Sequence, residues 1–311
     1  MVLPQKVQQK INEMLSDKKM TEYKKVQKSL TQKYKNQSGK GLSLIDSKQD
    51  SLLYAFSRMP ATFSVLHTLI QQLQKQQLLK NFDSVIDMGS GTGAGYFAIK
   101  ELNESIEISL FERDKNMIDI FNHFETGEIV EQFDLTKSQT DKKADLVMTS
   151  YVLSELSDEQ RMLAAKKLFD MTNKYLLIVD TGTPKVWQQM MNIKTALENY
   201  GAKTLAPCRA KECCLENDYC QFYARVERSA VHKQVKDGSL SYEDEKYFYL
   251  LFSKDEVFID DRARLIRRPI IKTNIATLSL CTKNGIMQKD FTKKNKDEYK
   301  KAKKAKINDL I

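Results

Sequence analysis

The stretch that decides the fold is Asp-Met-Gly-Ser-Gly-Thr-Gly at residues 87–93. Its first residues end a short apolar run at 84–88, which predicts a strand, and the residues after it predict a helix. Gly89, Gly91 and Gly93 let the backbone turn tightly and let a ligand approach without a Cβ in the way. This order of strand, glycine loop and helix is typical of a nucleotide-binding turn in an α/β fold.

Strand and helix patterns alternate along the chain after this loop. Strands are predicted at 84–88, 106–111, 129–135, 145–150 and 175–180, and helices at 158–172 and 184–200. Helical spacing also marks 1–40 and 51–80, strands are predicted at 219–226 and 247–253, and a hairpin turns at 283–285. Strands that alternate with helices of this length predict a parallel sheet with helices on both faces. We therefore expect an α/β, Rossmann-like fold, with a helical N-terminal region and a cysteine-rich C-terminal β extension.

The residues around the glycine loop indicate which nucleotide the loop binds. Gly89, Gly91 and Ala94 also fit a dinucleotide site, but such folds normally have an apolar residue where this chain has Asp87. An acid two residues before the first glycine is usual where the ligand carries the cationic methionine end of S-adenosylmethionine. Glu112 ends the next predicted strand, where a carboxylate can accept hydrogen bonds from both ribose hydroxyls. A glycine-rich turn that binds nothing is the remaining alternative.

We expect the cofactor contacts to come from strand ends and the glycine loop, namely from Asp87, Gly89, Ser90, Gly91, Gly93, Glu112 and Ser150. Methyl transfer asks little of a protein beyond placing the acceptor in line with an activated methyl group. Residues 149–152, where a target base would lie, lack the Asp/Asn-Pro-Pro-aromatic box of enzymes that modify exocyclic amines. No catalytic cysteine pair for attack on a pyrimidine ring is recognisable either. No catalytic residue is therefore assigned, and enzymatic activity stays open.

The basic residues are concentrated at the two ends of the chain. The net charge is +9, and residues 1–40 hold ten lysines and three acids, while residues 291–311 hold eight lysines and three acids. The middle of the chain is therefore weakly acidic. Separate lysine clusters are typical of a protein that lies on nucleic-acid phosphate, although lysine-rich ends can also be merely solvated.

Hydropathy and the N-terminal sequence exclude some classes of protein. No run approaches the roughly eighteen apolar residues that a membrane span needs, so we expect no membrane partner. The first 25 residues lack the apolar core of a secretory signal. They also make a weak mitochondrial presequence, because Arg is absent before Arg58 and three acids interrupt them.

All five cysteines lie after residue 207, at Cys208, Cys213, Cys214, Cys220 and Cys281. Thiolates suit zinc and iron–sulfur clusters, and four of them can close either kind of site. The spacing is not that of a zinc ribbon, but the predicted hairpin could bring Cys281 to the loop that holds the others. Reduced thiols without metal, or one zinc ion held by three of them, are the alternatives.

Ten short stretches, in their order, resemble the mitochondrial small-ribosomal-subunit methyltransferase-like family, which includes methyltransferase-like protein 17 and its fungal and bacterial relatives. They span about residues 54 to 290. They are Arg-Met-Pro-Ala-Thr at 58–62, the glycine loop at 87–93, Val-Leu-Ser-Glu-Leu at 152–156, Asp-Thr-Gly-Thr-Pro at 180–184, Ala-Pro-Cys at 206–208, Tyr-Cys-Gln-Phe at 219–222, Arg-Val-Glu-Arg-Ser at 225–229, Tyr-Glu-Asp-Glu-Lys at 242–246, Arg-Pro at 268–269 and Leu-Cys at 280–281.

The resemblance implies a Rossmann methyltransferase fold that binds S-adenosylmethionine and, through four cysteines, an iron–sulfur cluster. Carried over to this sequence, the ligands of a 4Fe-4S cluster, or of zinc as the alternative, are Cys208, Cys214, Cys220 and Cys281. The chain departs from the family where Arg209-Ala210 replaces a Pro-His pair, and where a Pro after the second cysteine is missing. Cys213 and Cys214 therefore compete for the second position.

A further departure concerns the cofactor pocket, because Asp180 stands where the family has a Glu at the end of the fifth strand. The shorter side chain is expected to loosen that pocket. Along the chain we expect a basic helical arm at 1–50, a helical lead-in and Rossmann-like domain at 51–205, a cysteine-rich region with closing strands and hairpin at 206–290, and a lysine-rich tail at 291–311.

Members of the resembling family associate with the small subunit of the mitochondrial ribosome, as assembly factors or resident proteins. The resemblance therefore implies a mitochondrial matrix protein that supports translation, with small-subunit rRNA and neighbouring ribosomal proteins as partners and no DNA. The alternative is an active S-adenosylmethionine-dependent rRNA methyltransferase. We favour the first, because both lysine-rich ends suit RNA while no target-base box is recognisable.

Overall fold

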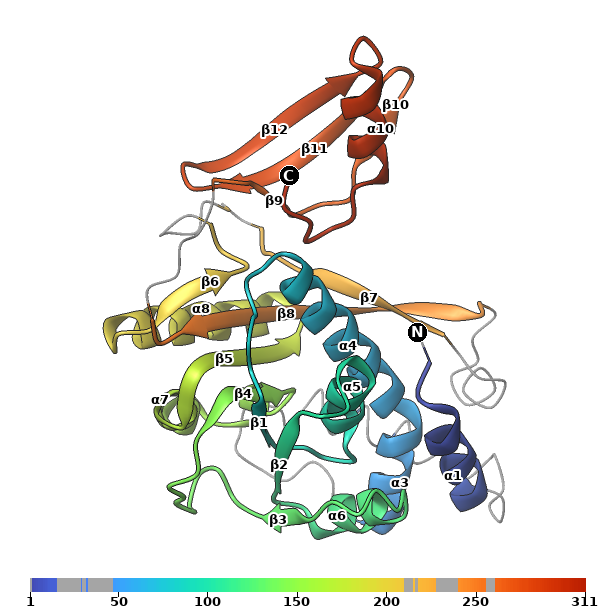
Figure 1. The fold of residues 1–311 in the computed structure, drawn as a ribbon, viewed down its shortest axis with the longest axis vertical. Coiled ribbons are helices and arrows are strands. Elements are labelled where there is room, and N and C mark those ends of the chain that lie inside the picture. The colour runs from blue at the N-terminus through green and yellow to red at the C-terminus, as the bar shows by residue number, and fades with distance from the viewer. Residues whose placement is uncertain are drawn as a thin grey trace.

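A twisted, mostly parallel sheet forms the centre of the protein, and a small second sheet follows it in the chain (Figure 1). The computed structural model describes residues 2–15, 29, 32, 47–209, 215, 218–227, 240–255 and 261–311. The strands of the main sheet are β1 (Ser84–Met88), β2 (Glu107–Glu112), β3 (Val130–Gln132), β4 (Ala144–Ser150), β5 (Thr172–Thr181), β6 (Lys203–Ala206), β7 (Phe222–Glu227) and β8 (Tyr242–Ser253).

The strand order β3-β2-β1-β4-β5-β8-β6 places the first crossover between β1 and β4. Strands β1 to β5 run parallel to one another, whereas β8 runs antiparallel to β5 and to β6. A parallel sheet whose strand order reverses beside its first strand leaves a crevice at the carboxyl ends there, and that crevice is where α/β folds bind ligands. The predicted α/β, Rossmann-like fold is confirmed.

Helices cover both faces of this sheet, with α4 and α5 on one side and α7 and α8 on the other (Figure 1). The helices of the main domain are α1 (Gln5–Leu15), α3 (Lys48–Ser57), α4 (Met59–Lys75), α5 (Ala94–Leu102), α6 (Lys115–Asn122), α7 (Asp158–Asp170) and α8 (Pro184–Asn199), with a short 3-10 turn at Leu153–Glu155. No helix in the described ranges combines the length and the apolar character that a membrane crossing requires.

Local sequence explains where several helices begin. Pro60 lies in the first turn of α4, where a missing N–H costs nothing, and the helical pattern predicted over 51–80 therefore splits into α3 and α4. Ser157 and Gln160 form a reciprocal cap at the start of α7. Thr183 caps α8 through the backbone N–H of Val186. These caps of α7 and α8 determine where the preceding loops at the carboxyl end of the sheet stop.

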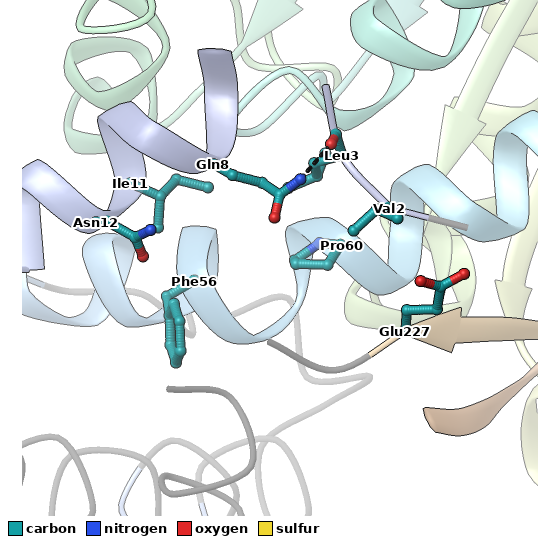
Figure 2. Close-up of a pocket in the computed structure, with 8 residues that line it drawn as sticks. All are labelled: Val2, Leu3, Gln8, Ile11, Asn12, Phe56, Pro60 and Glu227. Carbon is teal, nitrogen blue, oxygen red and sulfur yellow. Dashed lines mark hydrogen bonds between the residues drawn. The ribbon is translucent and has the colours of Figure 1, made fainter. Parts of the chain in front are cut away.

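The N-terminal helix α1 buries Val7, Ile11 and Leu15 on one face, which confirms the helical spacing predicted there. Figure 2 shows the small cavity of about 50 Å³ that remains between this helix, α3 and the start of α4. Within it, the side-chain amide of Gln8 donates a hydrogen bond of 2.6 Å to the carbonyl of Leu3. Most of the rest of the basic arm, at 16–46, lies outside the described residues.

The C-terminal module is a four-stranded sheet with one helix packed on it (Figure 1). Its elements are β9 (Arg264–Leu265), β10 (Ile270–Lys272), β11 (Ile275–Thr282), β12 (Gly285–Thr292) and α10 (Lys296–Lys304). The register pairs Thr282 with Gly285, so the predicted hairpin forms with a two-residue turn. Tyr299 and Ala302 of α10 are buried in a separate small core.

The strand predicted at 247–253 begins earlier than expected, because the acidic residues Glu243, Asp244 and Glu245 also belong to it. They lie within β8, paired with β7. Arginine partners explain the difference, because Asp244 bonds to Arg225 and Arg268 while Glu245 pairs with a residue of the main domain. Paired carboxylates can occupy a strand that unpaired ones would disfavour.

Candidate functional site

The glycine loop turns sharply at the carboxyl end of β1. Gly89, Gly91 and Gly93 have φ values of 76°, 56° and 88°, a backbone region that favours glycine. The backbone N–H groups of Gly89 and Ser90 both donate to the carbonyl of Phe111 in β2, at 2.8 and 2.9 Å. The loop is therefore fastened to the neighbouring strand before α5 begins.

The space around each glycine differs. A Cβ on Gly89 would collide with the side chain of Val152, and one on Gly93 would collide with the ring of Phe121. A Cβ on Gly91 would meet no atom within 4 Å. The open side of the loop therefore lies at its middle glycine, whereas the outer two are held by packing.

Asp87 is buried at the end of β1 with a relative exposure of 1%, and neither of its carboxylate oxygens has a hydrogen-bond partner among the described residues. Gly95 in the first turn of α5 makes room for this carboxylate, because a Cβ there would overlap it. Burial, and then the charge of Glu112, raises the pKa of Asp87 to about 7. A buried acid that lacks every partner is costly unless something else supplies one.

Two hydroxyls of the same loop are also buried without a hydrogen-bond partner among the described residues. They are the side-chain oxygens of Ser90 and Thr92. Together with Asp87 they form a set of unused polar groups around one turn. Native structures leave few such groups unsatisfied, so their concentration at a glycine loop indicates a ligand site.

Glu112 ends β2 and reaches the glycine loop directly. One of its carboxylate oxygens accepts the N–H of Gly91 at 2.8 Å, and the other accepts the N–H of Asp114 at 2.8 Å. Burial raises the pKa of Glu112, and these backbone hydrogen bonds partly offset that effect. The structure thus brings Asp87 and Glu112 to one loop, and each oxygen of Glu112 keeps a further lone pair for a ligand hydroxyl.

Ser150 ends β4, and the residue after it has an unusual conformation. Tyr151 has a φ of 59°, which is strained for a tyrosine, and its hydroxyl is buried without a hydrogen-bond partner among the described residues. The Arg58 guanidinium lies 5.9 Å from the ring centre, and it also pairs with Glu245 at 2.9 Å. Burial raises the pKa of Tyr151 well above its usual range.

The sequence interpretation did not assign this cluster of Arg58, Tyr151 and Glu245. The only sequence feature that pointed to Arg58 was the Arg-Met-Pro-Ala-Thr stretch. That stretch supported the family resemblance but did not indicate a contact between Arg58 and Glu245. Arg58 lies between α3 and α4, while Glu245 lies 187 residues later in β8. A pair so distant in the chain becomes visible only when the sheet order is known.

Asp180, at the end of β5, fastens the segment that follows β4. Its two oxygens accept the backbone N–H groups of Ser154 at 3.0 Å and Thr181 at 2.7 Å. Burial raises the pKa of Asp180, and these hydrogen bonds partly lower it again. The shorter acid at this position thus ties the 3-10 turn to β5.

Two of the predicted metal ligands, Cys208 and Cys281, lie near Arg264 at the start of the C-terminal module. Cys281 in β11 lies directly across from Arg264 in β9, and Arg264 Nε donates to the carbonyl of Pro207, the residue before Cys208. Burial raises the pKa of Tyr249, and the charges of Cys208 and Cys220 contribute to the rise. Cys213 and Cys214 lie outside the described residues.

The fit of these residues to a metal cluster is therefore one of donor chemistry. Cys208, Cys220 and Cys281 are half-buried thiols on three separate segments. Within the described ranges no three His, Cys, Asp or Glu side chains lie together as a formed metal site. The donor set still suits iron–sulfur or zinc, because thiolates are the preferred ligands of both.

The lysines of the C-terminal tail are exposed. All eight between residues 291 and 311 are exposed, and within the described chain none of their ammonium groups bonds to a carboxylate. The opposite face of α10 is buried through Tyr299 and Ala302. The helix therefore presents its charges outward, away from the small core.

Three solved methyltransferases are similar to this chain in fold. The plantazolicin methyltransferase BpumL, solved with S-adenosylhomocysteine, is 12% identical; the match covers 74% of this chain and 99% of that one, with a TM-score of 0.47. The magnesium protoporphyrin IX methyltransferase from Synechocystis PCC 6803, solved with S-adenosylmethionine, is 12% identical; the match covers 72% of this chain and 91% of that one, with a TM-score of 0.43. The N-methyltransferase NodS from Bradyrhizobium japonicum WM9, solved with S-adenosylhomocysteine, is 12% identical; the match covers 61% of this chain and 86% of that one, with a TM-score of 0.40. At such identities the likeness concerns the fold alone.

Sequence comparison identifies a family. No curated protein matches this chain significantly. Residues 48–311 match the family described as mitochondrial small ribosomal subunit Rsm22, and this range covers the main sheet, the cysteines and the C-terminal module. The expected resemblance is thereby confirmed, and the chain belongs to the mitochondrial small ribosomal subunit Rsm22 family.

Proposed function

We propose that the glycine loop binds S-adenosylmethionine. The observation that carries this proposal is the buried carboxylate of Asp87, which has no partner within the described chain although the hydroxyls of Ser90 and Thr92 lie in the same loop. A cationic methionine end would give Asp87 the opposite charge that it lacks. The ribose hydroxyls would bond to Glu112, and the open side of Gly91 would admit the ligand.

S-adenosylmethionine supplies a methyl group that its sulfonium already activates, so the protein needs mainly to hold and orient it. The residues of this chain serve those two tasks. Glu112 fixes the loop through Gly91, and Gly95 leaves room for Asp87. No catalytic residue is assigned.

We propose further that the protein acts as a structural or assembly component of the mitochondrial small ribosomal subunit, in the matrix, and that it supports translation. Membership of the Rsm22 family supports this role. The exposed lysines of α10 and its flanks support contact with rRNA, because phosphate contacts by lysine provide most of the sequence-independent affinity for nucleic acids. The basic arm at 1–40 would add to this surface.

A salt titration of binding to small-subunit rRNA tests the role of the tail. Changing Lys300, Lys303 and Lys304 to Glu is expected to weaken binding and to reduce the slope of affinity against salt concentration. Changing Lys115, Lys143 and Lys185 to Glu is the matched control, since these are three exposed lysines of the main domain and the net charge changes by the same amount. Equal losses in both variants would mean that only net charge matters, and unchanged binding would contradict the proposed surface.

We also propose a 4Fe-4S cluster held by Cys208, Cys214, Cys220 and Cys281, with zinc as the alternative metal. The thiolate chemistry of the set supports the assignment, together with the position of Cys281 across from Arg264, whose guanidinium bonds to the carbonyl of the residue before Cys208. Anaerobic purification followed by iron, sulfide and zinc analysis separates the two metals. About four irons per chain is expected, and a chain without either metal would contradict the site.

Single substitutions test the ligand set. Cys281→Ser is expected to remove the metal and to loosen the C-terminal module, because the energy of metal binding would be folding energy there. Serine at Cys213 and at Cys214, one at a time, identifies which of the two binds. Loss of metal from the Cys213 variant alone would assign the second position to Cys213.

Catalysed methylation of rRNA is the second candidate function. The observation in its favour is the strained Tyr151, whose hydroxyl is buried without a partner among the described residues, at the strand end where an acceptor would lie. Transfer of labelled methyl groups from S-adenosylmethionine to small-subunit rRNA tests it. Transfer by the wild type that is lost in Tyr151→Phe would establish the enzyme, and an absence of transfer would favour the structural role.

A further inference from the structure

The ribbon that β7 forms with the first half of β8 has one buried and one exposed face. Phe222, Ala224 and Val226 of β7 are buried, and α4 packs against this strand. Because side chains alternate along a strand, Tyr223 and Arg225 lie on the opposite face. The ribbon itself lies between the body of the main domain and the C-terminal module (Figure 1). None of the sites described above uses this second face.

Two arginines on the second face each lie over a tyrosine ring. The guanidinium carbon of Arg225 is 4.0 Å from the centre of the Tyr242 ring, and that of Arg268 is 4.1 Å from the centre of the Tyr223 ring. Arg225 and both tyrosines belong to the ribbon, whereas Arg268 lies between β9 and β10 in the C-terminal module. Each ring therefore covers one side of a flat cation, in a favourable cation–π contact.

A single carboxylate holds both guanidinium groups in place. Asp244 lies directly across from Arg225 in the ladder, and it accepts hydrogen bonds from Arg225 Nε at 3.0 Å and from Arg268 Nη2 at 2.7 Å. The exposed fractions of the two arginine side chains are still 55% and 60%, against 23% for Asp244. Two cations share one anion, so these three side chains keep a net positive charge, and more than half of each arginine is open to solvent.

This arrangement suits a partner with flat faces and negative charge. An exposed arginine normally samples many rotamers, and ordering it on binding costs free energy. Here the ring beneath each guanidinium and the carboxylate beside it already restrict that freedom. Unpaired nucleic-acid bases stack on guanidinium planes and aromatic rings, whereas paired bases inside a duplex hide their faces.

We propose that the arginine–tyrosine cluster of Tyr223, Arg225, Tyr242, Asp244 and Arg268 binds unpaired nucleotides of rRNA. A base stacks on the exposed side of each guanidinium, and the positive charge attracts the neighbouring phosphates. The inference rests on the rRNA contact proposed above, and it adds a second surface to the lysines of the C-terminal tail. The two surfaces differ in what they recognise, because the lysines attract phosphate in any RNA and the cluster requires an accessible base.

A purely structural role makes a different prediction. Arg268 joins the C-terminal module to the ribbon through Asp244 and Tyr223. A cluster that only fastens these two parts of the chain affects thermal stability and does not distinguish single-stranded from paired RNA. A stacking surface affects the binding of accessible bases and leaves the binding of a duplex unchanged.

The experiment measures binding of the full chain to an unstructured oligouridylate, and to the same oligouridylate paired with its oligoadenylate complement, at several salt concentrations. Arg225→Lys with Arg268→Lys keeps both charges and removes both planar groups. Arg113→Lys with Arg267→Lys is the matched control, because Arg113 is exposed in the main domain and Arg267 pairs with Asp218 instead of lying over a ring. The melting temperature of each variant reports on its fold.

The proposal expects Arg225→Lys with Arg268→Lys to bind the oligouridylate about tenfold more weakly or worse, because base stacking is lost. The salt slope is expected to stay the same, since the charge is the same. Affinity for the duplex, and both affinities of the control variant, are expected to stay at the wild-type level. Wild-type affinity of the arginine variant for the oligouridylate, or an equal loss for both probes, would overturn the proposal.

Asp244→Asn separates stacking from charge. This change adds one positive charge to the surface, so charge attraction alone predicts tighter binding of both probes. The proposal expects weaker binding of the oligouridylate, because both guanidinium groups lose the carboxylate that holds them over their rings. Tighter binding of the oligouridylate would overturn it. If Asp244→Asn does not fold, the arginine-to-lysine variant decides alone.

The outcomes distinguish failure of this inference from failure of the proposed rRNA contact. A wild type that binds neither probe overturns both. Binding that falls when Lys300, Lys303 and Lys304 are changed to Glu, but not in the arginine-to-lysine variant, overturns the cluster alone. If that variant binds both probes normally yet no longer associates with small-subunit particles, a protein contacts the cluster, and the assignment to RNA is overturned.

Discussion

Replacing Asp87 with Asn is expected to stabilise the ligand-free protein above neutral pH. Burial and the charge of Glu112 raise the pKa of this carboxyl from its ordinary 3.8 to about 7 in the folded chain. Between those two pH values the folded state keeps a proton that the unfolded state has lost. The free energy of unfolding therefore falls as pH rises through this window. Above pH 7 the accumulated loss amounts to about 4 kcal/mol.

Urea unfolding of the wild type and of Asp87→Asn at several pH values from 4 to 8.5 isolates this contribution. Glu112 and Asp180, whose pKa values burial also raises, remain in both chains and largely cancel in the difference. A buried amide without a partner costs about 1–3 kcal/mol, but it does so at every pH alike. The difference in unfolding free energy should therefore move in favour of Asn by up to about 4 kcal/mol between pH 4 and pH 8.

Parallel stability profiles for the two chains would refute this reasoning, because they would mean that Asp87 titrates normally in the folded state. Ligand binding gives an independent check. The affinity of the wild type for S-adenosylmethionine is expected to rise with pH up to about pH 7 and then level off, since the cationic end needs the ionised carboxylate. Asp87→Asn is expected to lose this affinity at every pH.

Four further variants test backbone strain, packing and charge. Gly91→Ala should lower the free energy of unfolding by about 1–2 kcal/mol, because its φ is positive. Gly93→Ala should lower it by roughly 1–3 kcal/mol more, because the added Cβ meets an aromatic ring. Chemical unfolding of both variants measures the difference. Lys300→Glu with Lys303→Glu should weaken rRNA binding while leaving the melting temperature within a few degrees, as filter binding and calorimetry can verify. Glu245→Gln should lower the unfolding free energy by roughly 2 kcal/mol, because it leaves a half-buried guanidinium without its carboxylate; an unchanged value would mean the pair is solvated.

Periodicity and glycine spacing were sufficient to predict the main sheet. The strands around residues 84–88 and 145–150 and the hairpin at 283–285 form where expected, because apolar runs bounded by turn residues are a local signal. The short strand β6 was missed, since four residues give no usable period. β8 begins several residues before its predicted start because arginine partners hold its acidic residues, and pairing between distant segments is not a local property.

The candidate cofactor site was predictable in its residues but not in its electrostatics. The sequence places Asp87 and Glu112 at the ends of successive strands, which parallel topology brings together. It cannot reveal that Asp87 has no hydrogen-bond partner in the described chain, or that Gly91 alone of the three glycines faces open space. Both depend on the side chains of neighbouring elements. Their roles in cofactor binding stay predictions.

The charged groups that sequence reasoning missed are those whose partners lie far along the chain. Arg58 meets Glu245 across 187 residues, and Arg264 reaches Gln76 across 188. Neither arginine belongs to a run or a motif with a known chemical role. Their significance comes from burial, which a single sequence indicates poorly for charged residues because most of them are exposed.

The central claim is that the glycine loop of this Rsm22-family chain takes S-adenosylmethionine, and isothermal titration calorimetry tests it most directly. The full chain at pH 8 is titrated with S-adenosylmethionine and, separately, with NAD, and Gly91→Leu serves as the variant whose side chain fills the ligand's space. We predict one site for S-adenosylmethionine on the wild type, no heat of binding with NAD, and no binding by a Gly91→Leu chain that still folds. Absence of binding by the wild type, a preference for NAD, or undiminished binding by Gly91→Leu would contradict the claim.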